Sequence, residues 1–325
     1  MDDAELFDSL SEVRQQLTEG IGRVVVGQRR VVELMLTALL ADGHCLFVGV
    51  PGLAKTLLVN TVAEAVGIGF GRIQFTPDLM PSDITGTEVL EEDRTTGRRS
   101  LRFVPGPVFT NLLLADEINR TPPKTQAALL QAMQEKVVTA SGQTHKLERP
   151  FLVFATQNPI EQEGTYPLPE AQQDRFMFSI PVGYPTTEEE EEVVRRTTVG
   201  EMPKAPRVLD IERLLAYQAM LRRLPTSKDV VSYCVRVTQG TRPDPARGTR
   251  ASKWLRWGAG PRASQYLAIG ARSWAALHGH EVPTIDDVRA VATAVLRHRV
   301  VLNFEAEASG LDADAIVSQI LEEVG

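Results

Sequence analysis

The sequence predicts an α/β fold, with an αβα core built on a parallel five-stranded sheet and an all-helical second domain after it. Over the first two thirds of the chain, short apolar runs alternate with stretches that space apolar residues as a helix does. After Pro181 the strand signals stop, and helical patterns continue. This succession is typical of a doubly wound sheet covered by helices on both faces, followed by a helical unit.

The strands expected in the sheet are short, and several are apolar almost throughout. They occupy residues 45–50, 72–76, 112–116, 151–156 and 178–181. Apolar residues at helical spacing predict helices between these strands at 31–41, 56–66 and 124–134. Strands that are apolar on both sides are expected where helices cover both faces of a sheet.

Helical patterns account for the rest of the chain. Thr186 and Thr187 precede a glutamate run at 188–192, an arrangement that caps a helix and suits the positive end of its dipole. Further helices are expected at 210–223, 228–238, 263–278 and 284–297. We therefore place a domain boundary near residue 185, with a core at 1–185 and a helical lid domain at 186–325.

Composition limits the classes of function. The 325 residues are 43% apolar and 24% charged, the balance of a folded globular protein. A net charge of −7 opposes a general role in coating nucleic acid. Such binding depends on Lys and Arg side chains, which release the counterions held by the phosphates. The acidic opening segment does not have the features of a secretory signal, and apolar runs stay too short to span a bilayer. We expect a cytoplasmic protein with buried thiols at Cys45 and Cys234.

A phosphate-binding loop follows the first strand. Residues 49–56 read Gly-Val-Pro-Gly-Leu-Ala-Lys-Thr, which matches the P-loop pattern except that Ala54 replaces its last glycine. Such a loop points backbone N–H groups at phosphates, Lys55 adds a cation, and the Thr56 hydroxyl is placed to bind Mg²⁺. Because Ala54 carries a Cβ, we expect a right-handed backbone there, as at the start of a helix. The core is therefore predicted to be a P-loop αβα domain that binds a nucleotide.

Two adjacent acids end the strand at 112–116. Asp116 stands at the carboxyl end of this strand, where it can hold Mg²⁺ through water. Glu117 follows it and can polarise a water for attack on the γ-phosphate. Together with the loop, the pair predicts hydrolysis.

The chain resembles the MoxR family of AAA+ ATPases over nearly its whole length. Six segments carry the resemblance in the family's order: 26–28 (Val-Gly-Gln), 49–56, 116–120 (Asp-Glu-Ile-Asn-Arg), 155–159 (Ala-Thr-Gln-Asn-Pro), 170–176 (Glu-Ala-Gln-Gln-Asp-Arg-Phe) and 260–264 (Gly-Pro-Arg-Ala-Ser). Ala54, unusual for P-loops in general, is similar to what the family carries. The resemblance implies an AAA+ core with an all-α lid that uses ATP and Mg²⁺.

The resemblance also implies roles for three polar residues further along. Asn158 would be the sensor-1 side chain, which hydrogen-bonds the γ-phosphate and helps to orient water beside Glu117. Arg175 would be the arginine finger, presented to the nucleotide of the neighbouring subunit. Arg262 would be sensor 2, at the start of a lid helix that closes over the same nucleotide.

Together, the loop and the resemblance define a nucleotide-binding set. Its members are Val26, Gly27, Gly49, Pro51, Gly52, Leu53, Ala54, Lys55, Thr56 and Leu57, of which the first two would line the adenine. Several of the assigned residues also have simpler interpretations. Asn158 before Pro159 could only start a turn, Arg175 and Arg262 could form surface ion pairs, and the adenine segment could be ordinary packing.

Two insertions are expected to form hairpins, at 78–109 and at 137–147. In the family such hairpins face the central channel of a ring, where they could engage a client. Packing between subunits is an equally good interpretation.

The resemblance implies an ATP hydrolase in a homo-oligomeric, hexameric ring that remodels or matures protein clients. Metal or cofactor insertion and complex assembly are the outputs it suggests, often with a partner that carries a von Willebrand A domain. Two alternatives are a motor stimulated by nucleic acid and a nucleotide-dependent binding switch with slow turnover. The segment 242–262, which contains Arg247, Trp254 and Trp257, could bind nucleic acid, but a lid or subunit contact is the simpler role.

Overall fold

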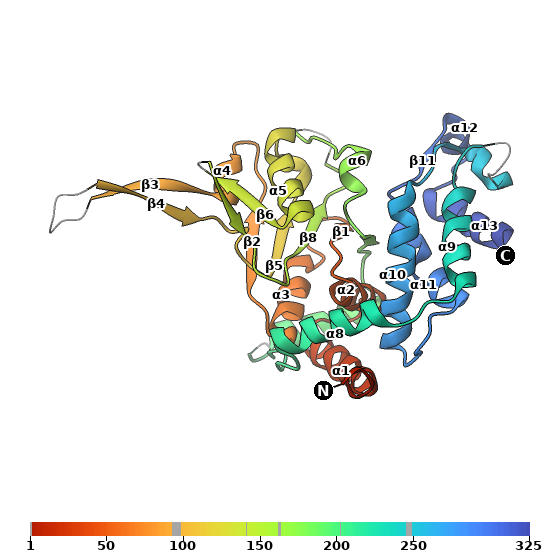
Figure 1. Ribbon diagram of the computed structural model, residues 1–325, viewed down its shortest axis with the longest axis horizontal. Coiled ribbons are helices and arrows are strands. Elements are labelled where there is room, and N and C mark those ends of the chain that lie inside the picture. Colours follow the sequence, from red (N-terminus) through yellow and green to blue (C-terminus); the bar gives the residue numbers. More distant parts are fainter. Residues whose placement is uncertain (1, 93–98, 141, 162–163, 202, 245–248) are drawn as a thin grey trace.

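The computed structural model of the chain describes residues 2–92, 99–140, 142–161, 164–201, 203–244 and 249–325. Figure 1 shows a sheet-bearing part beside a helical part, with α10 on the border between them. A long hairpin, formed by β3 and β4, projects from the sheet-bearing part on the side away from the helical part.

Five parallel strands form the central sheet in the order β2-β5-β8-β1-β9. They are β1 (Cys45–Val48), β2 (Phe70–Gln74), β5 (Leu112–Asp116), β8 (Leu152–Gln157) and β9 (Phe178–Pro181). The predicted parallel five-stranded sheet is confirmed, with β2 beginning two residues earlier than the run at 72–76. Because β1, β8 and β5 are neighbours, the segments that leave their carboxyl ends meet at one edge.

Helices cover both faces of this sheet, which is why its strands are apolar throughout. Along β5, Leu112 and Leu114 point to one face, and Leu113 and Ala115 point to the other. The first face packs against α1 (Asp3–Val24), α2 (Arg29–Leu40) and α3 (Lys55–Val66). The second packs against α4 (Pro81–Thr85) and α5 (Pro123–Glu135). The short elements η1 (Ile118–Arg120) and α6 (Glu170–Gln173) follow β5 and β8.

Helix α1 lies outside the elements predicted from the sequence. Asp2 caps its first turn through a reciprocal pair of hydrogen bonds with Glu5. Its buried side chains recur at helical spacing: Leu6, Leu10, Val13, Leu17 and Ile21. This periodicity was available in the sequence, so the helix could have been predicted from it.

The helical part follows the sheet. Its helices are α7 (Thr187–Thr198), α8 (Ile211–Arg223), α9 (Lys228–Gly240), η2 (Arg250–Trp254), α10 (Pro261–Leu277), α11 (Ile285–Leu296), α12 (Phe304–Ala308) and α13 (Ala313–Val324), and it has one strand pair, β10 (Leu255–Trp257) and β11 (Val301–Leu302). Thr186 caps α7 as expected. Among the described helices, none has both the length and the apolar character needed to cross a bilayer.

The two parts share one apolar core. The cluster on the α1–α3 face of the sheet continues into α9, α10 and α11. Helix α8 follows the predicted boundary in sequence, yet it packs on α1 and α2, where Gln218 donates a hydrogen bond to the carbonyl of Leu39 at 2.8 Å. The domain boundary near residue 185 stays a prediction.

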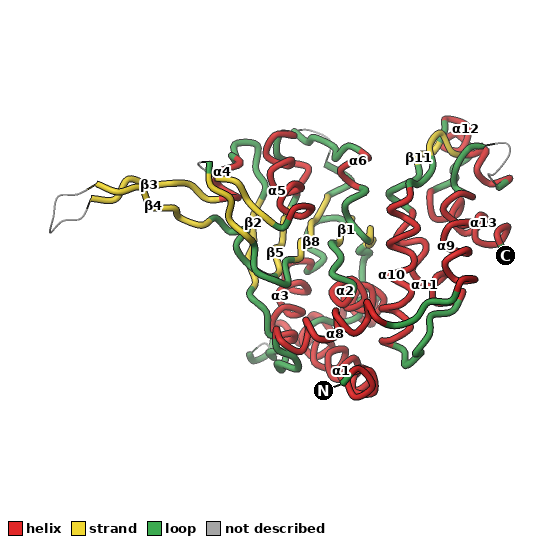
Figure 2. Tube along the Cα trace, viewed as in Figure 1, coloured by secondary structure: helices red, strands yellow, loops and turns green. Residues whose placement is uncertain are grey.

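Each insertion contains an antiparallel strand pair (Figure 2). Strand β3 (Gly86–Glu92) pairs with β4 (Arg99–Pro105), and β6 (Val137–Ala140) pairs with β7 (Gln143–Lys146). Leu90 and Leu101 face each other across the first pair and are 62% and 66% exposed. The projecting hairpin therefore offers apolar side chains to a partner.

Candidate functional site

A cavity of about 460 Å³ opens where the carboxyl ends of β1, β5 and β8 meet. We call it the phosphate cavity. It is lined by Pro51, Gly52, Leu53, Ala54, Lys55, Thr56, Leu57, Arg72, Gln74, Asp116, Glu117, Thr156 and Asn158. The structure thus brings the predicted loop residues, both acids and Asn158 together, although they come from three separate segments of the chain.

The loop holds Lys55 ready for an anion. Its ammonium donates hydrogen bonds to the carbonyls of Gly49 at 2.7 Å and Val50 at 2.6 Å. Burial lowers the pKa of Lys55, while the nearby charges of Asp116 and Glu117 raise it. Gly49 itself leaves no room for a side chain, since a Cβ there would lie 2.5 Å from the carbonyl oxygen of Val182.

The expectation for the backbone of Ala54 is wrong. Ala54 has φ 53° and ψ 24°, the left-handed conformation, and it precedes the first residue of α3 instead of lying within the helix. An alanine in this conformation costs about 1–2 kcal/mol because its Cβ crowds a carbonyl oxygen. Such strain persists only where the surroundings impose it, and it is common at binding sites. Glu117 is held in the same way, with φ 56°.

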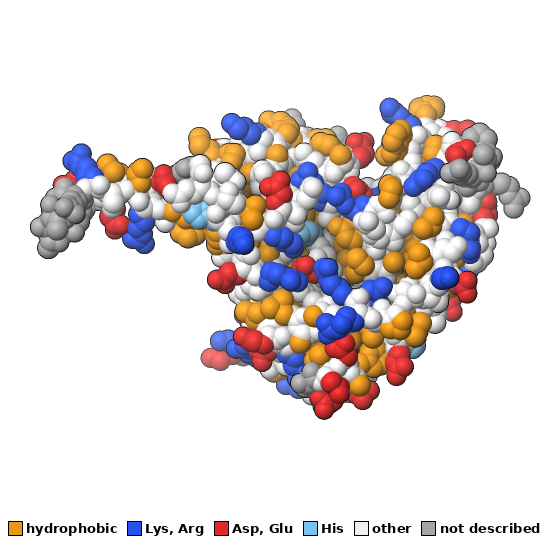
Figure 3. All heavy atoms as spheres, viewed as in Figure 1, with side chains coloured by type: hydrophobic (Ala, Val, Ile, Leu, Met, Phe, Trp, Pro, Cys, Tyr) orange, Lys and Arg blue, Asp and Glu red, His pale blue; other side chains and the backbone are white. Residues whose placement is uncertain are grey.

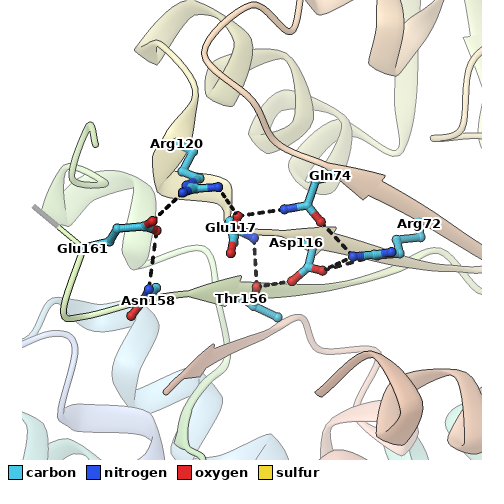
Figure 4. Close-up of polar contacts among 8 residues, drawn as sticks. All are labelled: Arg72, Gln74, Asp116, Glu117, Arg120, Thr156, Asn158 and Glu161. Carbon is cyan, nitrogen blue, oxygen red and sulfur yellow. Dashed lines mark hydrogen bonds and ion pairs between the residues drawn. The ribbon is translucent and has the colours of Figure 1, made fainter. Parts of the chain in front are cut away.

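Both acids are held by Thr156, which is buried (Figure 4). The Thr156 hydroxyl donates to Asp116 Oδ1 at 2.6 Å and accepts from the backbone N–H of Glu117 at 2.8 Å. Arg72 donates to Asp116 Oδ2 at 2.7 Å. These bonds fix the position of the Asp116 carboxylate at the floor of the cavity.

The Glu117 carboxylate lies between two donors (Figure 4). Its Oε2 atom accepts hydrogen bonds from Gln74 Nε2 at 2.8 Å and from Arg120 Nη1 at 2.9 Å. Arg120 also pairs with Glu161, whose other oxygen lies 3.4 Å from Asn158 Nδ2. The water-orienting candidate Glu117 and the sensor candidate Asn158 therefore belong to one polar network.

Sequence reasoning missed five members of this network: Arg72, Gln74, Thr156, Arg120 and Glu161. Arg72 and Gln74 occupy alternate positions of β2, on either side of the buried Ile73, so they share one face. Polar residues at period two in an otherwise apolar strand were a usable signal. Arg120 lies within the Asp116–Arg120 motif but has no role in the general P-loop pattern.

An apolar cavity of about 410 Å³ adjoins the phosphate cavity and shares Pro51, Gly52, Leu53, Ala54 and Leu57 with it. Val26 lines it, as do Tyr184 and Val193. Gly27 is not among its lining residues, but its φ of 68° turns the chain there, and a Cβ would lie 2.4 Å from Glu189 Oε1. Position and polarity suit a nucleotide base.

Arg175 and Arg262 lie elsewhere. Both line a third cavity of about 200 Å³, together with Asp42, His44, Met133, Gln134, Lys136 and Tyr266, which we call the basic cavity. Arg262 donates to Oδ2 of Asp174, the residue before Arg175, at 2.9 Å. Its sensor-2 role stays a prediction. Helix α10 packs against the sheet edge at β9, where a Cβ on Gly270 would lie 3.4 Å from the Phe178 ring, and this packing places Arg262 there.

Asp174 connects the two parts of the molecule at this point. Its Oδ1 atom accepts from Arg299 at 2.8 Å, and the buried guanidinium of Arg299 also donates to the carbonyls of Phe176 and Met177. Burial lowers the pKa of Arg299, while Asp174 raises it. Asp174, anchored by the buried Arg299, thus holds Arg262 beside Arg175.

The basic, tryptophan-containing segment 242–262 is described only in part. Residue Arg247 lies outside the described residues. Trp254 packs against the main core with Lys253 4.5 Å from its ring centroid, whereas Trp257 is 69% exposed. Trp254 therefore packs within the helical part, and the role of the segment stays a prediction.

The residues of the phosphate cavity fit a triphosphate with Mg²⁺. Asp116 supplies a carboxylate and Thr56 a hydroxyl at the same cavity, and Mg²⁺ prefers oxygen ligands of this kind alongside phosphate and water. Lys55 and the start of α3 supply the positive charge that the phosphates need.

Comparison with known proteins agrees with this site. Residues 44–178 match the family model of the ATPase family associated with various cellular activities (AAA), and residues 247–320 match that of the AAA lid domain. Chaperone MoxR1 of Mycobacterium tuberculosis is 47% identical over 94% of this chain and 80% of that protein. Protein YeaC of Bacillus subtilis is 41% identical over 98% of this chain and 96% of that protein.

Protein MoxR of Paracoccus denitrificans is 32% identical over 86% of each chain. The crystal structure of a protein from Cytophaga hutchinsonii, described as an ATPase, has a TM-score of 0.91 and 40% identity, and covers 99% of this chain and 97% of that one. These matches include the phosphate loop, the acids and the helical part. The chain therefore belongs to the MoxR family of AAA+ ATPases, P-loop enzymes that hydrolyse ATP.

Proposed function

We propose that this ATPase acts as a ring in which each active site is shared by two copies of the chain, and that its cycle remodels protein clients. One observation carries the shared site. The phosphate cavity and the pair Arg175 and Arg262 lie at different places on one chain. An arginine that stabilises the transferring phosphoryl group must touch it, so a second copy has to supply it.

Within one chain, the reaction uses the residues of the phosphate cavity. Lys55 and the loop amides bind the phosphates, and Thr56 and Asp116 hold Mg²⁺, which supplies positive charge to the phosphate oxygens. Glu117 accepts a proton from water as the water oxygen attacks the γ-phosphorus. The bond from that phosphorus to the bridging oxygen breaks, and ADP and phosphate leave. Asn158 orients the water.

The two donors on Glu117 bear on this step. Gln74 and Arg120 donate to the same carboxylate oxygen and hold the side chain in place. A water that approaches this oxygen has to replace one of the two donors.

From the neighbouring copy, Arg175 and Arg262 approach together. A guanidinium is always charged and can donate two parallel hydrogen bonds to phosphate oxygens. Asp174 holds Arg262 at 2.9 Å in the isolated chain, and a phosphate that competes for Arg262 would loosen this contact. Because Asp174 also binds Arg299 of the helical part, this loosening would couple nucleotide state to the lid.

Client remodelling is supported by one relative, which is named a chaperone, and by the projecting hairpin. Leu90 and Leu101 are exposed on that hairpin, where they could bind apolar segments of a client. Metal or cofactor insertion and complex assembly are forms that such remodelling could take. A hexameric ring, a von Willebrand A domain partner and a cytoplasmic location remain part of this proposal.

Mixing two inactive variants tests the shared site. Lys55→Ala removes the phosphate cation, and Arg175→Ala removes the arginine supplied to the neighbour. Each variant alone should lose turnover, while a mixture should regain it at about one interface in four on random assembly. Absence of recovery at every ratio, or full turnover by dilute monomers, would refute the shared site.

A second variant identifies what the ring acts on. Glu117→Gln keeps the shape of the side chain but removes the proton acceptor, so ATP binding and ring assembly should persist while turnover stops. A pull-down with this variant and ATP should retain protein clients. Turnover that rises with DNA and falls steeply with salt would instead favour a nucleic-acid motor. Slow turnover with every partner would favour a binding switch.

A further inference from the structure

The basic cavity contains a third cation whose role the known motifs do not cover. Lys136, the first residue after α5, lines this cavity together with Arg175 and Arg262. The acid that also lines it is Asp42. His44 adds no positive charge, since burial lowers its pKa to about 3. Arg262 pairs with Asp174, and Lys136 and Arg175 together with Asp42 still leave an excess of positive charge, which suits an anion.

Lys136 is held firmly but is only partly neutralised. Its ammonium donates to the carbonyl of Phe151 at 2.7 Å and lies 3.6 Å from Asp42 Oδ1. The Asp42 carboxylate is shared with Arg149 at 3.9 Å and Arg222 at 3.8 Å. Burial lowers the pKa of Lys136, as do the two arginines, and Asp42 opposes them.

Backbone strain marks the same cavity. Among the described residues, those other than glycine with left-handed φ are Gln28, Asp42, Ala54, Glu117 and Lys136. Each lines the apolar, the phosphate or the basic cavity. After a helix, glycine is the residue that adopts this conformation most readily, so a lysine at 136 pays a conformational cost that its side chain must offset.

Positive charge also extends around the cavity. Figure 3 shows Lys and Arg side chains gathered across the middle of this face, between the sheet-bearing part and α10. Because the chain carries a net charge of −7, this concentration is local. Such a field attracts a strongly anionic group.

We propose that Lys136 is a third cation that this chain supplies, together with Arg175 and Arg262, to the triphosphate bound by its neighbour. The proposal rests on the shared site described above. A flexible ammonium can turn from the Phe151 carbonyl to a phosphate oxygen, where it balances charge that the two guanidinium groups leave uncovered. Asp42 would then pair with Arg149 and Arg222 instead.

The test variant is Lys136→Gly, which removes the ammonium and suits the backbone φ of 55°. Turnover should fall about 10- to 100-fold, the usual effect of losing a charge-assisted hydrogen bond in the transition state. Binding of ATP to the isolated chain should not change, because Lys136 does not line the phosphate cavity. Lys136→Arg should keep most of the turnover.

Mixing shows on which side of the interface Lys136 acts. With Lys55→Ala chains, Lys136→Gly should regain turnover at about one interface in four, since each chain supplies what the other has lost. A mixture of Lys136→Gly and Arg175→Ala chains should not regain turnover, because both substitutions remove a cation supplied to the neighbour's nucleotide. Arg223→Gln, which removes an exposed arginine that pairs with Asp3 and does not line the basic cavity, should leave turnover unchanged.

The outcomes separate this proposal from the shared site. If Lys55→Ala with Arg175→Ala recovers turnover but Lys55→Ala with Lys136→Gly does not, Lys136 does not act across the interface. If neither mixture recovers, the shared site itself fails. Wild-type turnover by Lys136→Gly alone would also overturn the assignment, as would a loss of turnover matched by a loss of folding in thermal unfolding.

Discussion

At the scale of single residues, the hydroxyl of Thr156 contacts both acids of the phosphate cavity. It donates to the metal-binding candidate Asp116 at 2.6 Å and accepts from the backbone of Glu117 at 2.8 Å. Thr156 is 1% exposed, so water cannot replace these bonds. A residue two positions before Asn158 thus positions both acids.

Thr156→Val should therefore impair turnover while the chain still binds ATP through Lys55. Valine has the shape of threonine but leaves the Glu117 N–H and one Asp116 oxygen unpaired, which costs about 1–3 kcal/mol for each buried group. We expect kcat to fall about 10- to 100-fold. Thr156→Ser keeps the hydroxyl, so this variant should keep most of the wild-type kcat. Equal kcat values for the valine and serine variants would contradict the positioning role.

At the scale of elements, the two insertions are joined by an aromatic contact. Phe103 of β4 stacks on His145 of β7 with ring centroids 4.0 Å apart and an interplanar angle of 11°. Phe109 meets both rings edge-on, at 5.7 Å and 6.2 Å. Contacts of this kind contribute about 0.5–1.5 kcal/mol beyond the apolar area that they bury. The projecting hairpin is thereby tied to the second one at its base.

Removing one ring should loosen the projecting hairpin but not the sheet. In His145→Ala, amide hydrogen exchange in β3 and β4 should speed up, while exchange in β5 and β8 stays as slow as in the wild type. His145→Phe keeps a ring there and serves as the control. Unchanged exchange in β3 and β4 of the alanine variant would show that the stack does not hold the hairpin.

The elements also show which features of the fold could be predicted from the sequence. All five strands of the sheet were predicted, because strands buried on both faces form apolar runs that stand out locally. The left-handed backbone at Ala54 was not predicted. This conformation is imposed by the surrounding fold, which offsets its conformational energy, and the neighbouring residues in the sequence do not specify it. Pairing of Arg72 with Asp116 joins two strands 44 residues apart, which no local pattern reports.

At the scale of the whole molecule, the buried His44 and the partly buried His298 make stability depend on pH. His44 accepts a hydrogen bond from the Val153 N–H through Nδ1, and burial lowers its pKa to about 3. Burial likewise lowers the pKa of His298 well below its usual value, helped by the charge of Arg299. In the unfolded chain both titrate near pH 6.5.

The unfolded state therefore binds more protons below pH 6.5, and stability falls as the pH falls. Between pH 6 and pH 5 the free energy of unfolding should drop by about 2 kcal/mol from these two groups. Urea unfolding at pH 7.5, 6 and 5 measures the drop. His44→Gln removes one titrating group and should roughly halve it. A free energy that is flat over this range would contradict the burial of neutral histidines.

By itself, the sequence determined the sheet, the phosphate loop, the two acids and the family. These are signals of local spacing: the loop binds phosphate through its own backbone, and the acids stand where a strand ends. Only the tertiary structure decided which cations share a cavity. Arg175, Arg262 and Lys136 come from three distant segments, and they meet because the apolar core packs α10 against the sheet edge and Asp174 holds Arg262 there. Packing between distant segments depends on the whole core, so it cannot be predicted from any local stretch of the sequence.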